Sequence, residues 1–254
     1  EILPSDWSSD VCSSDLKGTL RAMDPRVHEA RPHAHQVSTA KNIRSLLLGS
    51  GIAERYLDYR VQDALSLRCI PQMHGASKKI LADGLVTLST ELNSSVDNPL
   101  IFGTEGDGAE VVMACNADGS YVGMASDCSA IALTALMKIS ERRIDRMVNL
   151  HVSELPPFLN RNPGLNNGLM IPQYAAAGLL GEMKLLSHPA TIDNAVTCAL
   201  QEDYTSMGGN AAIKFHRAAR LARYILAIEL LNAAQAQDFY TDLAPSAKDR
   251  KSVV

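Results

Sequence analysis

Apolar and small residues recur at intervals of three and four along most of this chain, the spacing that places them on one face of an α-helix. The clearest run extends from Tyr121 to Met147, and a second extends from Ser206 to Phe239. A short strand is indicated only at Gly108–Met113. Shorter helical patterns cover residues 31–48, 83–93 and 172–186. The pattern therefore predicts an all-α fold in which long helices pack as a bundle.

The two ends of the chain do not follow this pattern. Ser5–Leu16 has neither helical nor strand periodicity, and its serines and aspartates crowd around the only Trp of the chain. Read back through the genetic code, this segment is similar to a translated short-read sequencing adapter, and Asp249–Val254 is similar to the other adapter. A serine-rich linker and a basic tail are the alternatives. We predict that residues 1–16 and 249–254 are non-native adapter artefacts and that residues 17–248 form one helical region.

The charge of the chain excludes several classes of partner. The formal net charge is −4, and most of it lies in the two end segments, which leaves residues 17–248 close to neutral. A near-neutral chain without a basic block has no electrostatic footprint for nucleic acid or for an anionic membrane. No apolar run approaches the roughly 20 residues that span a bilayer. We therefore expect neither nucleic acid nor a membrane as a partner.

The cysteines and histidines do not indicate a metal site. The cysteines of the helical region are widely spaced and form no Cys-x-x-Cys pair, which favours reduced thiols in the cytoplasm over disulfides or zinc. They are Cys69, Cys115, Cys128 and Cys198. His28, His33 and His35 lie close together in the sequence, but no Cys or carboxylate completes a known ligand spacing. We therefore expect ordinary polar contacts for these histidines and no metal.

Chemistry is indicated first in the loop-like segment Val61–Gly75, where Gln62, Asp63 and Arg68 stand among apolar residues. A guanidinium beside apolar surface needs an anionic partner, because burying an unpaired charge is very costly. Its planar fork of donors matches a carboxylate through two parallel hydrogen bonds. A bound carboxylate is one candidate partner. An internal salt bridge between Arg68 and Asp63 is the other, and composition alone favours it.

Three further loop-like segments carry clustered polar residues. Glu91–Leu100 contains Asp and Asn residues that can bond the local backbone and fix a turn. Cys115–Ser120 precedes the predicted helix at Tyr121–Met147, and Asp118 or Ser120 could cap that helix. In Gln201–Asn210, the neighbouring acids Glu202 and Asp203 point to opposite sides of an extended segment, so one of them can face a site.

Taken in order, these segments resemble landmarks of the methylidene-imidazolone-dependent ammonia-lyases of histidine, phenylalanine and tyrosine and their aminomutase relatives. Gln62–Gly75 is similar to the family's Gln-Asp-x-Tyr-x-Leu-Arg-x-x-Pro-Gln motif, and Asn93–Leu100 is similar to its Asn-Ser-x-x-Asp-Asn-Pro-Leu motif. Gln201–Met207 resembles the histidine-lyase form of its segment. Further matches lie at residues 26–33, 46–50, 140–143 and 164–168. The resemblance covers about residues 21–239, nearly all of the predicted helical region.

The resemblance implies a homotetramer of long helices, of the fumarase/aspartase-like type, that removes ammonia from an L-amino acid to give an α,β-unsaturated acid. The family's electrophile, methylidene-imidazolone (MIO), forms from an Ala-Ser-Gly in the N-terminal half. In this chain Gly75-Ala76-Ser77 is followed by Lys78, so no Ala-Ser-Gly occurs. The family's catalytic tyrosine base also lies upstream. We therefore expect a C-terminal fragment that is inactive alone.

The family's roles carry over to four positions. By resemblance, Arg68 clamps the substrate carboxylate and Gln62 bonds near the carboxylate and the electrophile. Glu202 faces the amino group or a polar side chain, and Asn116 aligns with a substrate-binding Asn. This makes Gln62, Arg68 and Glu202 the expected catalytic residues, with Asn116 and Leu65 beside them in the substrate site.

Two departures from the family pattern leave the substrate open. Leu65 stands where most members have Tyr, and Ala117 stands where an aromatic residue packs in the family. We therefore expect a divergent member, which acts on histidine, an aromatic or another amino acid. An aminomutase and a non-catalytic tetrameric scaffold are the alternatives. The related fumarase/aspartase group ranks low, because its Gly-Ser-Ser-x-Met-Pro-x-Lys-x-Asn loop is missing from this sequence.

Overall fold

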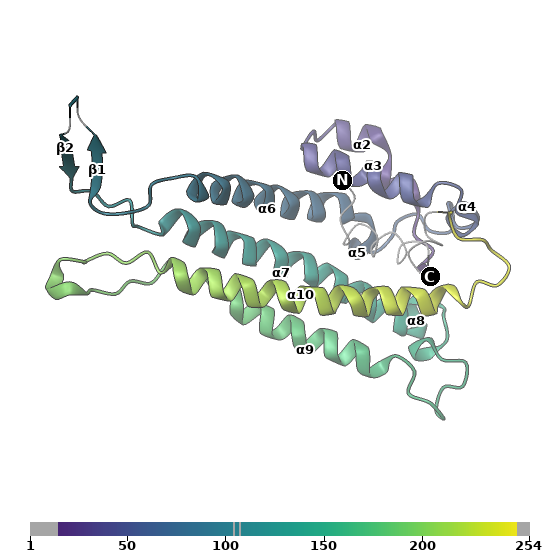
Figure 1. The fold of residues 1–254 in the computed structure, drawn as a ribbon. Helices are drawn as coiled ribbons and strands as arrows, with labels where there is room; N and C mark the ends of the chain where they lie inside the picture. Colours follow the sequence, from purple (N-terminus) through teal and green to yellow (C-terminus); the bar gives the residue numbers. More distant parts are fainter. Residues whose placement is uncertain (1–14, 104, 107, 248–254) are drawn as a thin grey trace.

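Long helices dominate the structure, a computed structural model that describes residues 15–103, 105–106 and 108–247. Helices α6 (Ile70–Leu92), α7 (Ser120–Val148), α9 (Met170–Leu186) and α10 (Gly208–Gln237) run side by side as a bundle (Figure 1). Helix α7 is central, because it packs against the other three. The predicted all-α bundle is confirmed, and the two longest helices begin and end within about two residues of their predicted bounds.

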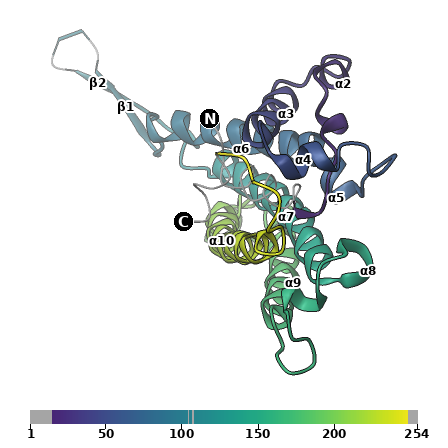
Figure 2. The same cartoon turned by 90° about the vertical axis from the view of Figure 1, so that its right-hand side faces the viewer.

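A group of short helices covers one end of the bundle (Figure 2). There, α3 (Ala34–Leu47) packs on α6 and carries α2 (Pro25–Glu29). Met23, Ile43 and Ile70 join these elements in a small core of their own. The remaining short helical elements are η1 Leu20–Met23, α4 Gly51–Arg55, α5 Leu65–Arg68, α8 Leu150–Ser153, η2 Pro157–Leu159 and η3 Cys198–Leu200.

The main core lies where α7 meets α9 and α10, and its centre includes a buried ion pair. Met137, Met183 and Ile225 are fully buried there. Beside them, the Nε of Arg143 lies 2.5 Å from Oε1 of Glu229, and both side chains are 0% exposed. Because burying unpaired charges is costly, this pair fixes how α7 and α10 face one another.

Helix α7 is also long and apolar enough to span a bilayer by length and composition alone. Half of that apolar window is buried inside the described part of the chain, against α6, α9 and α10. Its small residues, Ser126, Ser129, Ala130 and Ala132, are buried at these contacts. Because α7 packs against these three helices, we interpret it as the core helix of the bundle. A core helix can be as long and as apolar as a membrane-spanning helix.

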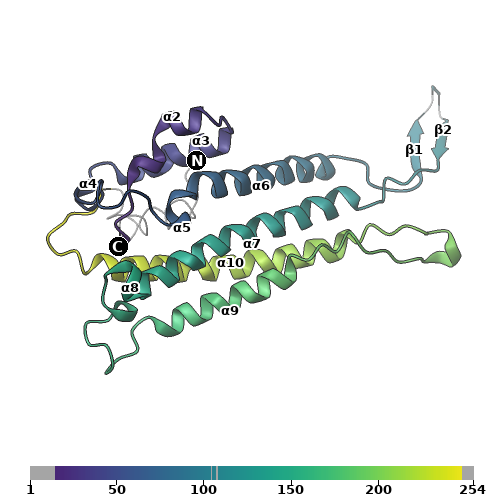
Figure 3. The same ribbon diagram turned by 180° about the vertical axis from the view of Figure 1, so that it is seen from behind.

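A two-stranded hairpin projects from the other end of the bundle (Figure 3). Strand β1 (Leu100–Gly103) pairs antiparallel with β2 (Ala109–Val112), with Leu100 opposite Val112. The predicted strand at Gly108–Met113 is confirmed as β2, but its partner β1 was not predicted.

The bundle leaves apolar faces uncovered. A groove of about 360 Å³ between α6 and α7 is lined by Ile80 and Met124, and one of about 600 Å³ between α9 and α10 is lined by Leu179 and Ile228. Large apolar side chains stand exposed on these helices, among them Leu85 (66%), Val86 (68%), Leu185 (77%) and Tyr224 (57%). Neighbouring exposed apolar side chains of this kind are typical of surfaces that pack against other protein.

Candidate active site

Gln62 and Arg68 come together at the start of the bundle. With the Gln62 amide oriented so that its oxygen faces Arg68, that oxygen accepts from Nη1 at 3.0 Å and from Nη2 at 2.6 Å. The contact forms because the chain turns between them through α5, in which Arg68 N bonds to Ala64 O at 3.0 Å. Arg68 is half-buried and Gln62 is exposed, so the fork lies at the surface of this chain.

The prediction that Val61–Gly75 is loop-like was wrong, since α5 and the first turns of α6 occupy most of it. Pro71 suggests a break, but it lies in the first turn of α6, where a missing N–H costs nothing. The side chains of Gln62 and Arg68 are therefore carried by a short helix and the turn before it, a firmer support than an open loop.

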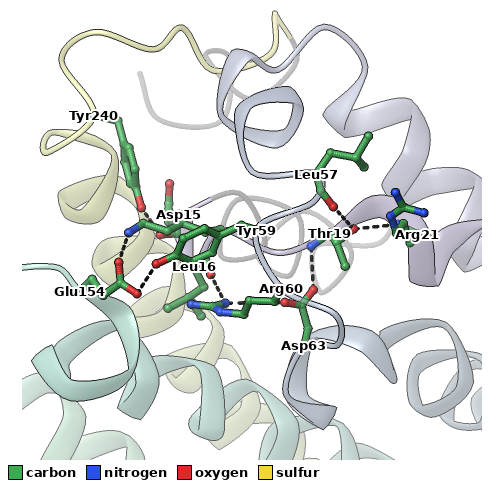
Figure 4. A network of polar contacts seen from close by, with 11 residues as sticks. Asp15, Leu16, Thr19, Arg21, Leu57, Tyr59, Arg60, Asp63, Glu154 and Tyr240 are labelled. Carbon is green, nitrogen blue, oxygen red and sulfur yellow. Dashed lines mark hydrogen bonds and ion pairs between the residues drawn. The ribbon is translucent and has the colours of Figure 1, made fainter.

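The salt bridge between Arg68 and Asp63, favoured by composition, was also wrong. The Asp63 carboxylate is buried and accepts from the backbone N–H of Thr19 at 2.6 Å (Figure 4). Its other oxygen lies 3.6 Å from Nη1 of Arg60. Asp63 thus anchors the segment to the chain before it, while the neighbouring Gln62 faces Arg68.

A wider polar network surrounds this anchor (Figure 4). The Glu154 carboxylate accepts from Lys17 Nζ and from the Tyr59 hydroxyl, both at 2.6 Å. These two hydrogen bonds lower the pKa of Glu154, and the hydrogen bond to Glu154 raises the pKa of Tyr59. The network is structural: Glu154 belongs to the turn after α8, and its contacts join that turn to the segment that leads to Gln62.

The predicted boundary of the native chain lies inside this network. Leu16 is 1% exposed and packs in the main core, and its carbonyl oxygen accepts from Arg60 Nη1 at 3.0 Å. Tyr240 donates to the carbonyl oxygen of Asp15 at 2.6 Å, and burial raises the pKa of its hydroxyl. The boundary at Lys17 stays a prediction, and the remainder of the first adapter-like segment and all of the second lie outside the described residues.

Leu65 shares the turn of α5 with Arg68. Its side chain is 60% exposed, whereas Ser66 and Leu67 face inward. Leu65 therefore lies on the outer side of the same turn as the half-buried guanidinium, where a bound molecule on Arg68 would meet it.

Asn116 lies at the opposite end of the bundle, beside the hairpin. It is exposed, and its amide donates to Ser95 O at 3.3 Å. The predicted turn at Asp97-Asn98 is confirmed: Asn98 N bonds to Asp97 Oδ1 at 2.7 Å, and Ala114 N bonds to Asn98 Oδ1 at 2.8 Å. These bonds tie the base of the hairpin to the segment that carries Asn116.

The start of α7 shows the predicted polar contact in a modified form. Asp118 Oδ1 accepts from Ser120 N at 3.0 Å, although the capping position itself is Gly119. Ser120 Oγ in turn lies 3.0 Å from the hydroxyl of Tyr204. This pair, which sequence reasoning missed, joins the Asn116 segment to the loop that carries Glu202.

Glu202 lies on a loop that is closed by its own hydrogen bonds. Its backbone pairs with Thr197 in both directions, at 2.9 and 3.3 Å. The Asn194 side chain donates to Asp203 O at 3.0 Å and accepts from Thr205 N at 2.7 Å. The Glu202 side chain is exposed, so the loop presents a carboxylate outward.

The backbone just before Glu202 is strained. Cys198, Ala199 and Leu200 have φ values of 49°, 52° and 75°, the left-handed region that costs a residue with a side chain roughly 1–2 kcal/mol. Conformations of this kind persist only where the surroundings enforce them, and they are frequent at functional sites. Here the Thr197–Glu202 pairing encloses the left-handed turn.

The structure thus brings the predicted site residues together in two groups rather than one. Arg143 of α7 contacts Ser66 next to the Gln62–Arg68 pair, whereas Ser120 of α7 contacts the Glu202 loop. These two positions of α7 are separated by about 35 Å at the helical rise of about 1.5 Å per residue. One copy of this chain therefore does not hold Arg68 and Glu202 around the same ligand.

The histidines and cysteines take ordinary places. His28 is 1% exposed; its Nε2 lies 3.0 Å from Ala22 O and its Nδ1 lies 3.1 Å from the Gln36 amide nitrogen. Burial lowers the pKa of His28. Within the described ranges, no three His, Cys, Asp or Glu side chains are grouped as metal ligands. Free thiols are found at Cys69, Cys115, Cys128 and Cys198.

The sequence is similar to a known family of enzymes over most of its length. The family model for aromatic amino acid lyases matches residues 5–253. The chain is 45% identical over 238 residues to a histidine ammonia-lyase of Caldanaerobacter subterraneus, covering 94% of this chain and 46% of that protein. It is 47% identical to a histidine ammonia-lyase of Koribacter versatilis, covering 90% of this chain and 46% of that protein. The chain thus spans about half the length of the curated relatives it matches.

Solved structures agree with the sequence matches. Histidine ammonia-lyase from Trypanosoma cruzi superposes with a TM-score of 0.89 at 39% identity, covering 98% of this chain and 46% of that one. Phenylalanine aminomutase from Pantoea agglomerans superposes with a TM-score of 0.89 at 32% identity, covering 97% of this chain and 51% of that one. The resemblance drawn from the sequence motifs is therefore confirmed.

Proposed function

The chain belongs to the aromatic amino acid lyase family, and from this premise we propose that the intact protein is an amino-acid ammonia-lyase. It would remove ammonia from L-histidine, from an aromatic L-amino acid or from a close analogue and release the α,β-unsaturated acid. The present chain would supply the carboxylate clamp and the polar residues of the substrate site. It would be inactive alone, because the electrophile and the base belong to the half of the family's length that it does not span.

The observation that carries this proposal is the contact between Gln62 and Arg68. Two nitrogens of one guanidinium donate to one amide oxygen, at 2.6 and 3.0 Å, at the surface of the chain. The same two nitrogens are suited to the two oxygens of a carboxylate. A substrate carboxylate can therefore bind to Arg68 with little rearrangement, with Gln62 beside it.

The second group of residues supplies polar contacts for the rest of the substrate. The exposed carboxylate of Glu202 is suited to accept a hydrogen bond from an ammonium group or an imidazole N–H. The exposed amide of Asn116 can donate and accept. Leu65 offers apolar contact next to the clamp, at the position where most members of the family have the phenol of a Tyr. This combination supports an amino acid as substrate and leaves its side chain open.

The residues of this chain fit an electrophile that is supplied from outside the chain. The sequence most similar to Ala-Ser-Gly is Ala76-Ser77-Lys78, which lies inside α6. Ser77 is buried there, and its Oγ donates to Ala132 O at 3.0 Å. A backbone held in a helix interior is not available to cyclise. Gln62, by contrast, turns its amide oxygen to Arg68 and leaves its N–H groups for a neighbouring acceptor. We propose that Gln62 lies beside MIO and that no metal takes part.

The roles of the chain's own residues follow from their charges. When bound, MIO supplies an electron-poor centre that turns the amino group into a better leaving group. Arg68 holds the substrate carboxylate and so fixes the α-carbon. Glu202 holds the ammonium group or a polar side chain through an N–H donor. Since the β-proton is only weakly acidic, a positioned base is also required, and we place it in the upstream half.

The separation of the two groups supports assembly from several copies. Because the positions of α7 that contact the Arg68 turn and the Glu202 loop are about 35 Å apart, a complete site needs Arg68 from one copy and Glu202 from another. The uncovered faces of α6, α9 and α10 offer surfaces for such contacts. We propose a homotetramer, in the cytoplasm, where the free thiols would stay reduced.

An aminomutase of the same family is the second candidate, because aminomutases are among the similar structures. It would return ammonia to the β-carbon and release a β-amino acid. A non-catalytic scaffold is the third, and the missing phenol at Leu65 favours it.

The deciding experiment restores the upstream half from the source DNA and assays the intact protein with L-histidine, L-phenylalanine and L-tyrosine. Ammonia release with a rise in ultraviolet absorbance of the unsaturated acid supports the lyase. A β-amino acid without net ammonia supports the aminomutase. Absence of an in-frame Ala-Ser-Gly upstream, with no turnover of any of the three, rejects both enzymes in favour of the scaffold.

A further inference from the structure

Arg143 is the largest fully buried side chain in the described part of the structure, and it is bonded in three directions. Its Nε lies 2.5 Å from Glu229 Oε1 on α10. Its Nη2 donates to Ser140 Oγ at 3.1 Å, one turn earlier on α7. Its Nη1 donates to the backbone oxygen of Ser66 at 3.2 Å, and Ser66 lies in the middle of α5.

This third bond reaches the turn that carries the carboxylate clamp. Helix α5 has only four residues, and its first position has no side-chain cap. In a helix this short, the carbonyl groups have few donors within the helix itself, so a donor from outside matters to its geometry. Ser66 lies two residues before Arg68 in the same short helix. A hydrogen bond to the Ser66 carbonyl therefore restrains the backbone that carries the Arg68 side chain.

Charged side chains hold this turn at two points, one before α5 and one within it. Before α5, the buried Asp63 bonds to Thr19 N at 2.6 Å. Within α5, Arg143 holds Ser66 O from the interior, while Leu65 is exposed on the outside. Glu229 and Ser140 fix the guanidinium of Arg143. The position of the turn therefore depends on how α7 packs against α10.

We propose that Arg143 is a positioning residue for the carboxylate clamp: locked by Glu229, it holds the Ser66 carbonyl and thereby sets the direction of Arg68. This inference rests on the proposed role of Arg68 as the clamp. Arg143 itself touches no substrate. Positioning matters here because both terminal nitrogens of Arg68 must face the two oxygens of the substrate carboxylate at the same time.

The test uses the intact protein, with the upstream half restored, and the variant Arg143→Lys. Lysine keeps the charge that faces Glu229, but a single ammonium does not reproduce the three-way fork. Thr134→Val is the matched control: Thr134 is buried on the same helix and bonds to Met183 O and Ser187 Oγ, far from α5. Two quantities are measured, steady-state kinetics with L-histidine or whichever probe amino acid is turned over, and hydrogen exchange of the backbone amides of Arg68 and Cys69.

For Arg143→Lys we expect KM to rise on the order of tenfold, with kcat per folded site nearly kept, because carboxylate binding is lost rather than chemistry. The Arg68 and Cys69 amides, bonded to Ala64 O and Leu65 O, should exchange at least several-fold faster. Thr134→Val should lower the melting temperature and leave KM and this exchange unchanged. A role in stability alone would make the two variants alike.

The outcomes separate this inference from the proposed function. If the intact protein turns over a probe and Arg143→Lys leaves KM unchanged, the positioning role is overturned whatever the exchange shows. If no probe is turned over, the proposed function fails, and the exchange decides: faster exchange at Arg68 and Cys69 supports a turn held by Arg143, and unchanged exchange overturns it.

Discussion

Gln62 Oε1 lies within hydrogen-bond distance of both terminal nitrogens of Arg68, at 3.0 and 2.6 Å, when the amide oxygen faces the guanidinium. The guanidinium is thus oriented by a neutral oxygen acceptor before any substrate arrives. A substrate carboxylate carries a full negative charge and is the stronger acceptor, so it can take over the contact. Orientation in advance lowers the entropic cost of binding.

Arg68→Lys in the intact protein should weaken carboxylate binding. Lysine keeps the positive charge but loses the planar fork, so one charge-assisted hydrogen bond of about 2 kcal/mol is lost. This corresponds to a fall in kcat/KM of about 30-fold, seen chiefly as a higher KM. Arg55→Lys, at an exposed site on α4, is the matched control and should change nothing. An unchanged KM for Arg68→Lys would show that Arg68 does not hold the carboxylate.

Leu65→Tyr should improve turnover of L-histidine if the site follows the family pattern. Leu65 is 60% exposed, so a phenol fits there without displacing core atoms. One added hydrogen bond of about 1 kcal/mol would raise kcat/KM about fivefold. Leu48→Tyr, at an 80% exposed position after α3, controls for a general effect of the added ring. A fall in activity instead would indicate a substrate that uses the apolar surface of Leu65.

His28 should make the stability of the protein depend on pH. Burial holds the pKa of His28 below its ordinary value, and Nδ1 accepts from the Gln36 amide, which requires the neutral ring. The unfolded state therefore binds the proton more tightly than the folded state. The stabilisation is complete above the unfolded pKa of about 6.5 and is lost as pH falls toward the lower folded pKa.

The measurement is the urea midpoint of the intact protein at pH 7.5 and pH 5.5. Wild type should lose stability at the lower pH, and His28→Gln should lose less between the two. His33→Gln, at an exposed position, should behave as wild type. Equal pH dependence in wild type and His28→Gln would rule out a neutral, buried His28 as its source.

Periodicity predicted the long helices well because their signal is local. Helix α7, predicted as Tyr121–Met147, extends over Ser120–Val148. The buried face of α10 includes Ala218, Ile225 and Glu229. A pattern of apolar residues does not predict that Glu229 is buried. Its carboxylate is buried beside the Arg143 guanidinium of α7, with which it forms an ion pair.

The failures have the same physical origin, contacts between segments far apart in the sequence. Strand β1 is only four residues long and exists through its pairing with β2, so its own residues give little signal. The bond from Arg143 to Ser66 O joins residues 77 positions apart. The motifs predicted that Arg68 and Glu202 belong to one site, which stays a prediction, whereas the three-dimensional fold places the two residues at opposite ends of the bundle.

Residues 17–248 expressed alone should not form a well-packed monomer. Leu85 (66% exposed), Leu185 (77%) and Tyr224 (57%) are examples of apolar side chains left in water on the long helices. We expect aggregation or binding of a hydrophobic dye, and no sharp thermal transition, whereas the intact protein should melt cooperatively. A soluble monomer with a sharp, cooperative transition would contradict this expectation.

The separation of Arg68 and Glu202 predicts complementation between inactive variants. If each site takes Arg68 from one copy and Glu202 from another, a mixed assembly of Arg68→Ala and Glu202→Ala subunits contains some sites with both native residues. Co-expression in equal amounts should restore roughly a quarter of the sites, as expected for random pairing in a symmetric assembly. Each variant expressed alone stays inactive and serves as the control.

If both residues of one site came from the same copy, every site in the mixture would carry a defect and activity would not return. In this structure, the contacts of α7 with Ser66 and with Tyr204 are about 35 Å apart. That result would mean that the intact protein has a different arrangement of α7, in which Arg68 and Glu202 of one copy come together. A double variant, Arg68→Ala with Glu202→Ala in one subunit mixed with wild type, adds a quantitative check. It should leave about a quarter of the sites intact under shared sites, and about half under sites within one copy.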